Sequence, residues 1–399
     1  MKKYRIGWIL FFLFLFFPGC AITVYGNSAE EKTGQVVTEE EIEAEEEKLT
    51  ESMLKKIGVE DIQDFLDEQE DFSDVSFFDM VCSLVEGKDG TCWEKCGEWL
   101  KNALCSEFLE TRGLFIQVLF ISIAFGILKN FTDIFDNSYI SGLCFVLVYG
   151  ILSILLMKSF LVMHTLTKDT MNTTVDFMRT LIPVYCMSMA FSNGTATAAA
   201  FYELTFVILY LVQWVLLYVL LPLVQVMVIF VFMNELLEGE KFQKMTELIE
   251  EGVGMALKLI TSAVVGLNVI QGLIQPAADK FKNSMISKTA SAIPGVGGSI
   301  RSVSEIIVSA GTLVKNSVGV AAMLLLFGLC LLPVIKMGVM AFFYKLSAAI
   351  VEPIADKRIA GTMNGVCRGS VLLAKILLTS VLLFLITIAM VTASTSFIY

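Results

Sequence analysis

Few side chains in this chain could perform chemistry within its apolar surroundings. The 399 residues include a single histidine, His164, and no H-E-x-x-H pattern, so neither a zinc site of that kind nor a histidine-dependent nucleophile relay is supported. The turn from Gly295 to Gly298 resembles a phosphate loop only in its glycines, because no Gly-Lys-Ser/Thr follows it. We therefore expect no enzymatic activity, no metal and no cofactor.

Polar residues inside the apolar runs are the better candidates for function, since such groups are costly in lipid unless they pair or line a wet path. Glu203, near the start of an apolar run, is the acid among them. It could form helix-to-helix hydrogen bonds, or it could bind a proton or ion. The full set is Glu203, Gln213, Gln225, Asn234, Asn268, Gln271, Lys336 and Lys345.

Four cysteines, Cys82, Cys92, Cys96 and Cys105, cluster before the first apolar run. If that segment is translocated, the compartment permits one or two disulfides. Free thiols are an alternative. A metal site at Cys92 and Cys96 is a weaker alternative, because paired C-x-x-C knuckles and a nearby histidine are lacking.

The composition indicates a membrane protein. Apolar residues make up 56% of the chain and charged residues 17%, with a mean hydropathy of +0.73. Apolar windows of about 17–25 residues recur, each long enough to cross a hydrocarbon core. They are apolar on every face, which favours helices over a membrane β-barrel. The net charge of −11 lies mostly in one N-terminal stretch, so nucleic acid is not an expected partner, whereas membrane lipid is.

Residues 1–26 are typical of a secretory signal peptide, with a basic start, an apolar core and a cleavage site after Gly26. A lipoprotein box at Gly19-Cys20 and an uncleaved anchor are alternatives. All three place 27–111 outside the cytoplasm. That segment opens with an acidic, low-complexity tether, and amphipathic patterns between Ile57 and Leu109 predict two or three surface helices.

Residues 112–399 form the expected membrane domain, an all-α bundle of about eight spans. The segment 181–192, which contains Pro183, is too short to cross comfortably and is interpreted as re-entrant or interfacial. Basic residues in 276–317 and 352–370 predict that both loops are cytoplasmic, whereas the acidic 238–256 loop is expected outside. The expected spans are 112–127, 139–161, 198–216, 219–237, 257–275, 318–334, 337–351 and 371–391.

The stretch 276–317 differs from the runs around it. It is basic and rich in small residues, with Pro294 followed by Gly295, Gly297 and Gly298, which predicts a hinge between two membrane blocks. Apolar residues then recur from Ile300 to Val314 at helical spacing, typical of an amphipathic helix.

Four stretches are distinctive when taken together: RTLIPVY at 179–185, SAIPGVGG at 291–298, LVKNSVGV at 313–320 and EPIADKR at 352–358. In this order they resemble the stage III sporulation protein AE family of endospore-forming bacteria. The order of signal sequence, acidic outer segment and multispan body is similar too. The candidate hinge or partner-docking residues in and beside these stretches are Arg179, Pro183, Pro294, Gly295, Gly297, Gly298, Lys315, Asn316, Glu352, Pro353, Asp356, Lys357 and Arg358.

The resemblance implies a function that the residues alone do not. Family members are encoded with an ATPase, small membrane proteins and ring-forming proteins, which build a secretion-like channel between mother cell and forespore. This chain would be the multispan subunit in the mother-cell-derived membrane, with its N-terminal segment between the two membranes and an export-gate or permease role. For the turn Glu352–Arg358, partner docking and a plain helix-ending turn both stay open.

An autonomous secondary transporter is the alternative function. It predicts inverted repeats and a polar site at midplane, and no convincing internal repeat is found. A membrane enzyme is disfavoured by the residues present.

Overall fold

The structure is a computed structural model that describes residues 58–69, 75–85, 112–113, 115–124, 126–127, 138–191, 196–237, 241–290, 297–355 and 357–394. The chain divides after Ala44 into two units, and every described residue belongs to the second, 45–399. The signal sequence, the acidic tether, Cys92, Cys96, Cys105, Pro294, Gly295 and Asp356 lie outside these residues. Predictions made for them stay predictions.

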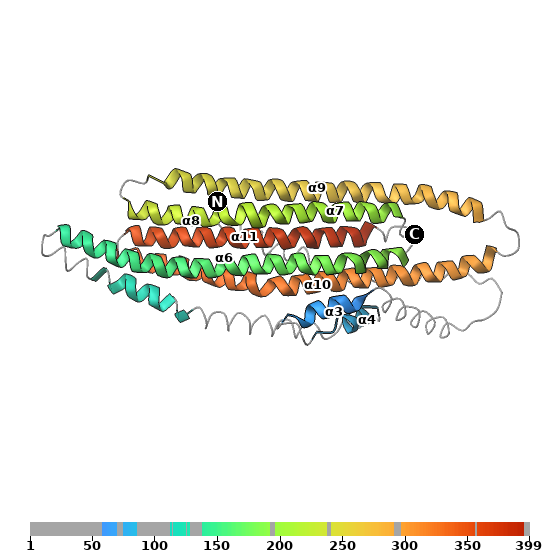
Figure 1. Ribbon diagram of the computed structural model, residues 1–399, viewed down its shortest axis with the longest axis horizontal. Coiled ribbons are helices and arrows are strands. Elements are labelled where there is room, and N and C mark those ends of the chain that lie inside the picture. The colour runs from blue at the N-terminus through green and yellow to red at the C-terminus, as the bar shows by residue number, and fades with distance from the viewer. Residues whose placement is uncertain are drawn as a thin grey trace. The chain divides into compact units, whose positions relative to one another are not determined.

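Every regular element within those ranges is a helix, as the composition predicts. The long helices are α6 (Ser138–Phe191), α9 (Gln243–Ala290), α10 (Gly297–Val351) and α11 (Lys357–Ser394). Between α6 and α9, α7 (Ala196–Val215) continues through one π-helical turn, η1 (Leu216–Leu220), into α8 (Leu221–Leu236). Figure 1 shows them side by side, with successive rods running in opposite directions.

Five of these rods are long and apolar enough to cross a membrane, within the part of the chain that the structure describes. The expected count of eight is not confirmed, because two expected pairs are single helices. Residues 198–216 and 219–237 join into one rod, and so do 318–334 and 337–351. The first expected span is the short apolar helix Phe115–Ala124.

The described prolines inside the rods do not break the helices. Pro222 has no backbone N–H to donate, and the π-helical turn lies just before it. There the N–H of Leu221 donates to the carbonyl of Leu216, five residues earlier, so the helix continues with a local widening. In α6 and α10, Pro183 and Pro333 lie inside uninterrupted helices. Residues 181–191 are therefore the end of α6 rather than a re-entrant segment.

The hinge expected at 276–317 is mostly helical. Residues up to Ala290 belong to α9, and α10 begins at Gly297 and Gly298, so a hinge in this stretch is confined to the connection between the two helices and stays a prediction. What lies between the helices is 291–296, outside the described residues. Ala310 and Val314, expected on the apolar face of an amphipathic helix, are buried.

The continuous α10 also changes the expected topology. Its two ends, Gly297 and Val351, lie at opposite ends of the bundle (Figure 1). The α10–α11 turn shares its end with the α8–α9 connection, not with the start of α10. The expectation that 276–317 and 352–370 lie on the same side of the membrane therefore does not hold for a bundle that α10 crosses once.

Two small helices cover part of the bundle. They are α3 (Val59–Asp67), which begins after Gly58 in the left-handed conformation that glycine tolerates (φ 82°), and α4 (Phe77–Val85). Gln63 ties them together, because its side chain donates to the carbonyl of Val75 at 3.1 Å and accepts from the N–H of Phe77 at 2.9 Å. They pack on α6 and α10 and confirm two of the surface helices expected before the membrane domain.

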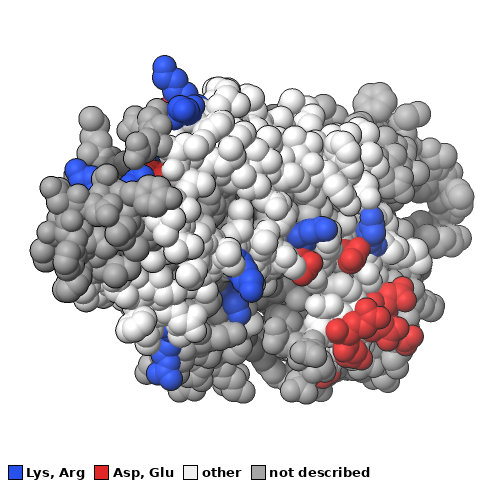
Figure 2. All heavy atoms as spheres, turned by 60° about the vertical axis from the view of Figure 1, so that its left-hand side comes forward, with Lys and Arg blue, Asp and Glu red and all other residues white. Residues whose placement is uncertain are grey.

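The described surface is mostly uncharged. Figure 2 shows scattered Lys, Arg, Asp and Glu over a broad uncharged face, with one dense group of acidic side chains. Along the chain the densest acidic stretch described is α3, whose Ile62 and Leu66 are buried while Glu60, Asp61, Asp64 and Asp67 are exposed.

Candidate functional site

Helix α11 is the centre of the bundle. It packs against α6, α7, α8, α9 and α10, and in Figure 1 it runs between the other long helices. Its sequence combines apolar residues with glycines and hydroxyl side chains at helical spacing. These two residue types make the contacts that position the neighbouring helices.

Glycines bring α8 close to α11. Gly361, Gly365 and Gly369 follow one another at four-residue spacing, so they lie on one face of α11. A methyl group on Gly365 would collide with Val231, and one on Gly361 would lie 2.6 Å from Oε1 of Glu235. Gly369 meets Val228 in the same way. This small-residue face permits the close approach that helix pairs in membranes favour.

Hydroxyl groups of α11 bind a different neighbour at each level. Near its start, Tyr149 of α6 bonds to Oγ1 of Thr362 at 3.1 Å and donates to the carbonyl of Phe232 in α8 at 2.8 Å. Further along, Ser380 donates to Oε1 of Gln213 in α7 at 2.8 Å. Nearer its end, Nδ2 of Asn268 in α9 donates to Oγ1 of Thr387 at 3.0 Å.

The C-terminal end of α11 carries a polar cluster. Oγ1 of Thr392 bonds to the hydroxyl of Tyr185 at 2.9 Å, and the fully buried Lys315 directs Nζ to the carbonyl of Thr392 at 3.4 Å. Gly319 lies against both Thr392 and the Tyr185 ring. A cation at this position satisfies a free terminal carbonyl and opposes the negative end of the helix dipole.

Two stretches that carry the resemblance meet in this cluster. Residues 179–185 contribute Tyr185 from α6, and residues 313–320 contribute Lys315 and Gly319 from α10. Asn316 is half-buried one residue further on. Segments far apart in the sequence thus form one site, which holds the last turn of α11 against α6 and α10.

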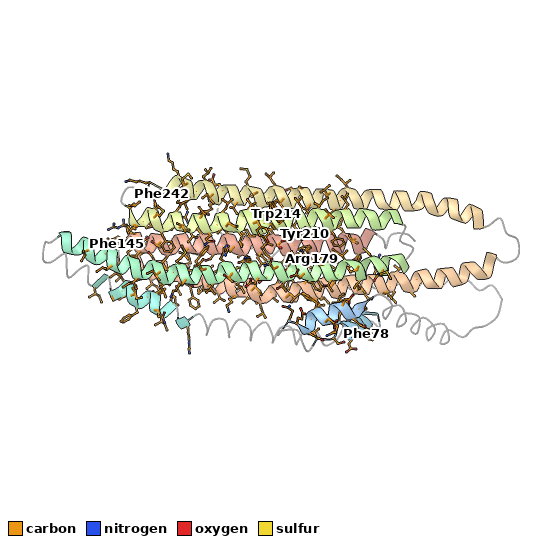
Figure 3. All side chains as sticks on the ribbon, viewed as in Figure 1. Phe78, Phe145, Arg179, Tyr210, Trp214 and Phe242 are labelled. Carbon is orange, nitrogen blue, oxygen red and sulfur yellow. The ribbon has the colours of Figure 1, made fainter. Side chains whose placement is uncertain are left out.

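Arg179 lies on the outer side of this region, between α6 and α7. Its Nη1 pairs with Asp176 at 3.1 Å, and its Nη2 donates to the hydroxyl of Tyr210 at 2.9 Å. The guanidinium also stacks over the Tyr210 ring at 5.2 Å. Figure 3 shows Arg179 and Tyr210 adjacent on these two helices.

At the opposite end of the bundle, the turn after α10 presents Glu352, Pro353 and Lys357 to the outside. The N–H groups of Ile354 and Ala355 both donate to the carbonyl of Val351, at 3.0 and 2.8 Å, which ends the helix in a tight turn.

Arg358 differs from its neighbours in this turn. Its guanidinium stacks over the ring of Phe145 in α6 at 3.7 Å, so it belongs to the fold. Gly126 packs on the same turn, because a methyl group there would lie 2.5 Å from the carbonyl oxygen of Ile354. The turn is thus held by α6 and by the segment that precedes it.

The polar residues expected inside apolar runs have several outcomes. Gln213 and Asn268 form interhelical bonds, as described above, and Lys345 donates to Asn364 of α11 at 3.1 Å. Asn234 accepts from the N–H of Phe242 at 3.1 Å and so joins α8 to the start of α9. Glu203 lies in α7, and its side chain is outside what the structure describes.

No group of three His, Cys, Asp or Glu that could hold a metal occurs among the described residues. His164 is half-buried in α6, and Cys82 is half-buried in α4. The disulfide prediction is untested, since its other cysteines are not described.

Sequence reasoning missed Tyr149, Tyr185, Thr362 and Thr392. The available signal was a hydroxyl inside an apolar run, which is weaker than a charge or an amide because many such hydroxyls bond only within their own helix. Thr170 and Ser188 do so, donating to the carbonyls of Leu166 and Val184.

Comparison with known proteins identifies the family. A family model described as stage III sporulation protein AE matches residues 75–395. The chain belongs to the stage III sporulation protein AE family. It is also 25% identical over 323 residues to stage III sporulation protein AE of Bacillus subtilis (strain 168), covering 78% of this chain and 79% of that protein. No solved structure matches it. The expectation drawn from the four stretches is confirmed, and the chain is a helical membrane protein of a sporulation family.

Proposed function

We propose that this protein is a non-enzymatic membrane subunit of a secretion-like channel complex linking mother cell and forespore, and that it acts as the permease or export gate of that complex. Its membership of the family carries the proposal, supported by a helical body with five candidate spans. Its partners would be an ATPase, ring-forming proteins and other stage III sporulation membrane proteins. Its place would be the mother-cell-derived membrane, with the N-terminal segment outside the cytoplasm.

The turn after α10 is our candidate docking surface, defined as Glu352, Pro353 and Lys357. These residues are exposed, and the stacking of Arg358 on Phe145 holds the backbone beside them. A short charged surface on a fixed backbone suits protein recognition, because little ordering entropy is lost on binding.

The proposal is tested by crosslinking in sporulating cells, followed by isolation of this protein and identification of what is attached. We expect other sporulation membrane proteins with the unaltered chain, and a loss of at least some of them with Lys357→Glu. Lys244→Glu is the matched control, since Lys244 is an exposed lysine of α9 at the same end of the bundle.

Three results would count against the proposal. If the protein is isolated without any attached sporulation membrane protein, the proposal that it is a channel subunit is refuted. If Lys357→Glu and Lys244→Glu lose attached proteins equally, the proposed docking surface is refuted. Movement of a solute by the purified protein alone in vesicles would favour the autonomous transporter instead.

A further inference from the structure

Neighbouring faces of α6 and α7 at one level of the bundle require different surroundings. The contact between Arg179 and Tyr210, 2.9 Å from Nη2 to the hydroxyl, shows that these parts of the two helices are side by side (Figure 3). Because the helices are antiparallel, the residues before Arg179 lie beside those after Tyr210. The surfaces on either side of this contact can therefore be compared directly.

The outward face of α7 around Tyr210 is apolar. Val207 is 62% exposed, Leu211 61% and Trp214 53%. In α9, which the bond from Asn268 to Thr387 places near this level, Val269 and Ile270 are also exposed. Such continuous apolar surfaces on candidate spans belong in lipid.

The outward face of α6 at this level is polar. Lys168, Asp169, Asn172, Asp176 and Arg179 are all exposed and recur at three- and four-residue intervals, whereas the residues between them, from Met171 to Met178, include the buried side of the helix. Arg179 and Asp176 form an ion pair with side chains 58% and 57% exposed. Four exposed charges on one helix face are unfavourable in hydrocarbon.

Helix α3 extends this polar sector. The ring of Phe65 packs on Phe177 of α6 at 5.6 Å, which fixes α3 beside the same part of α6. Its acidic residues Glu60, Asp61 and Asp64 point outward and are exposed. One side of the bundle thus needs water at a level where another side needs lipid.

We propose that the polar face of α6, defined as Lys168, Asp169, Asn172, Asp176 and Arg179, lines a water-filled path at the level of the membrane, closed on its open side by further copies of this chain. The inference rests on the proposed channel function and names the wall of the path. The face carries two bases and two acids, so copies can turn it toward one another without net repulsion. Such a wall suits small hydrophilic solutes with little selection by charge.

The test is thiol labelling in membrane fragments that expose both membrane faces, with the full-length chain made in the absence of other sporulation proteins. Asn172→Cys reports on the polar face. Leu211→Cys in α7 and Tyr218→Cys in η1 report on the neighbouring rod, where both residues are exposed. Each variant is compared with the unaltered protein, which has nine cysteines. A charged, water-soluble maleimide is the probe, and a lipid-soluble maleimide shows that each thiol is present.

We expect the charged reagent to label Asn172→Cys at least tenfold faster than Leu211→Cys and Tyr218→Cys, with the lipid-soluble reagent labelling all three. Equal fast labelling of all three would place this level outside the membrane and overturn the path. Slow labelling of Asn172→Cys would overturn it as well, because the polar face would then be covered.

Closure by copies is tested with the same variant. A flexible bis-maleimide should join two Asn172→Cys chains into a product of twice the mass. Absence of the doubled product, or attachment to a protein of different mass, would overturn closure by copies. Since no sporulation partner is present here, failure of the path is distinguishable from failure of the partners proposed above.

Discussion

Replacing Gly365 by alanine tests the packing of α8 on α11. The added methyl group would collide with Val231, which is buried and β-branched. A β-branched side chain in a helix has one strongly preferred rotamer, so Val231 cannot turn away at low cost. The two helices must separate, or one backbone must shift.

The magnitude follows from two opposing effects. Alanine in place of glycine in a helix interior stabilises by up to about 1 kcal/mol, while overpacking a buried contact costs about 1–3 kcal/mol. Gly338 in α10 is the matched control, because nothing lies within 4 Å of a methyl group added there. We expect the free energy of unfolding of Gly365→Ala to be about 1–3 kcal/mol below that of Gly338→Ala.

The assay measures unfolding of the purified proteins in mild detergent. Denaturant is added stepwise, and unfolding is monitored as the loss of the helical circular dichroism signal. Val231→Ala combined with Gly365→Ala should recover part of the loss, since the new methyl group then occupies vacated space, with a coupling of about 0.5–3 kcal/mol. If Gly365→Ala is as stable as Gly338→Ala and the double variant shows no coupling, α8 and α11 do not meet at this position.

Two further predictions concern the interior and the topology. Gln213→Ala and Ser380→Ala should each destabilise the bundle, and a double-mutant cycle should give a coupling of about 0.6 kcal/mol, the mean for such bonds inside membrane proteins; strict additivity would show that the bond is absent. Thiols introduced at Thr289, near the end of α9, and at Glu352 should react with an impermeant reagent from opposite sides of a sealed membrane, because α10 runs straight between the two ends. Labelling of both thiols from the same side would show that α10 does not cross the membrane once, as expected if it were broken into the two spans 318–334 and 337–351.

The helical membrane class could be predicted from composition because hydropathy depends on residue type alone. The continuity of the long helices could not be predicted from composition. The expected breaks fell at 217–218 and 335–336, but an apolar run long enough for two spans can also form one long helix. The backbone groups released by Pro222 and Pro333 can be satisfied locally by a π-helical turn or by neighbouring helices. Dividing the apolar runs into span-length windows therefore gives four spans where the structure has two rods. Because a continuous α10 crosses once rather than twice, 352–370 lies on the opposite side from the one expected relative to 276–317.

The candidate site was partly predictable. Lys315 and Arg358 were found through the resemblance, but their surroundings were not, because the groups they meet lie far away in the sequence. Lys315 reaches the end of α11, and Arg358 stacks on Phe145. Exposed docking was expected for Arg358, whereas among the described residues of that turn it is Lys357 that presents its charge to the outside.

The central position of α11 has a consequence for how the protein is made. The ribosome synthesises α11 after α6, α7, α8, α9 and α10. The hydrogen-bond partners of Gln213 and Asn268, however, lie in α11. Until α11 is inserted, those amides have to rely on water or on other polypeptides at the insertion site. A nascent chain halted before residue 357 should therefore remain bound to the insertion machinery and be degraded early.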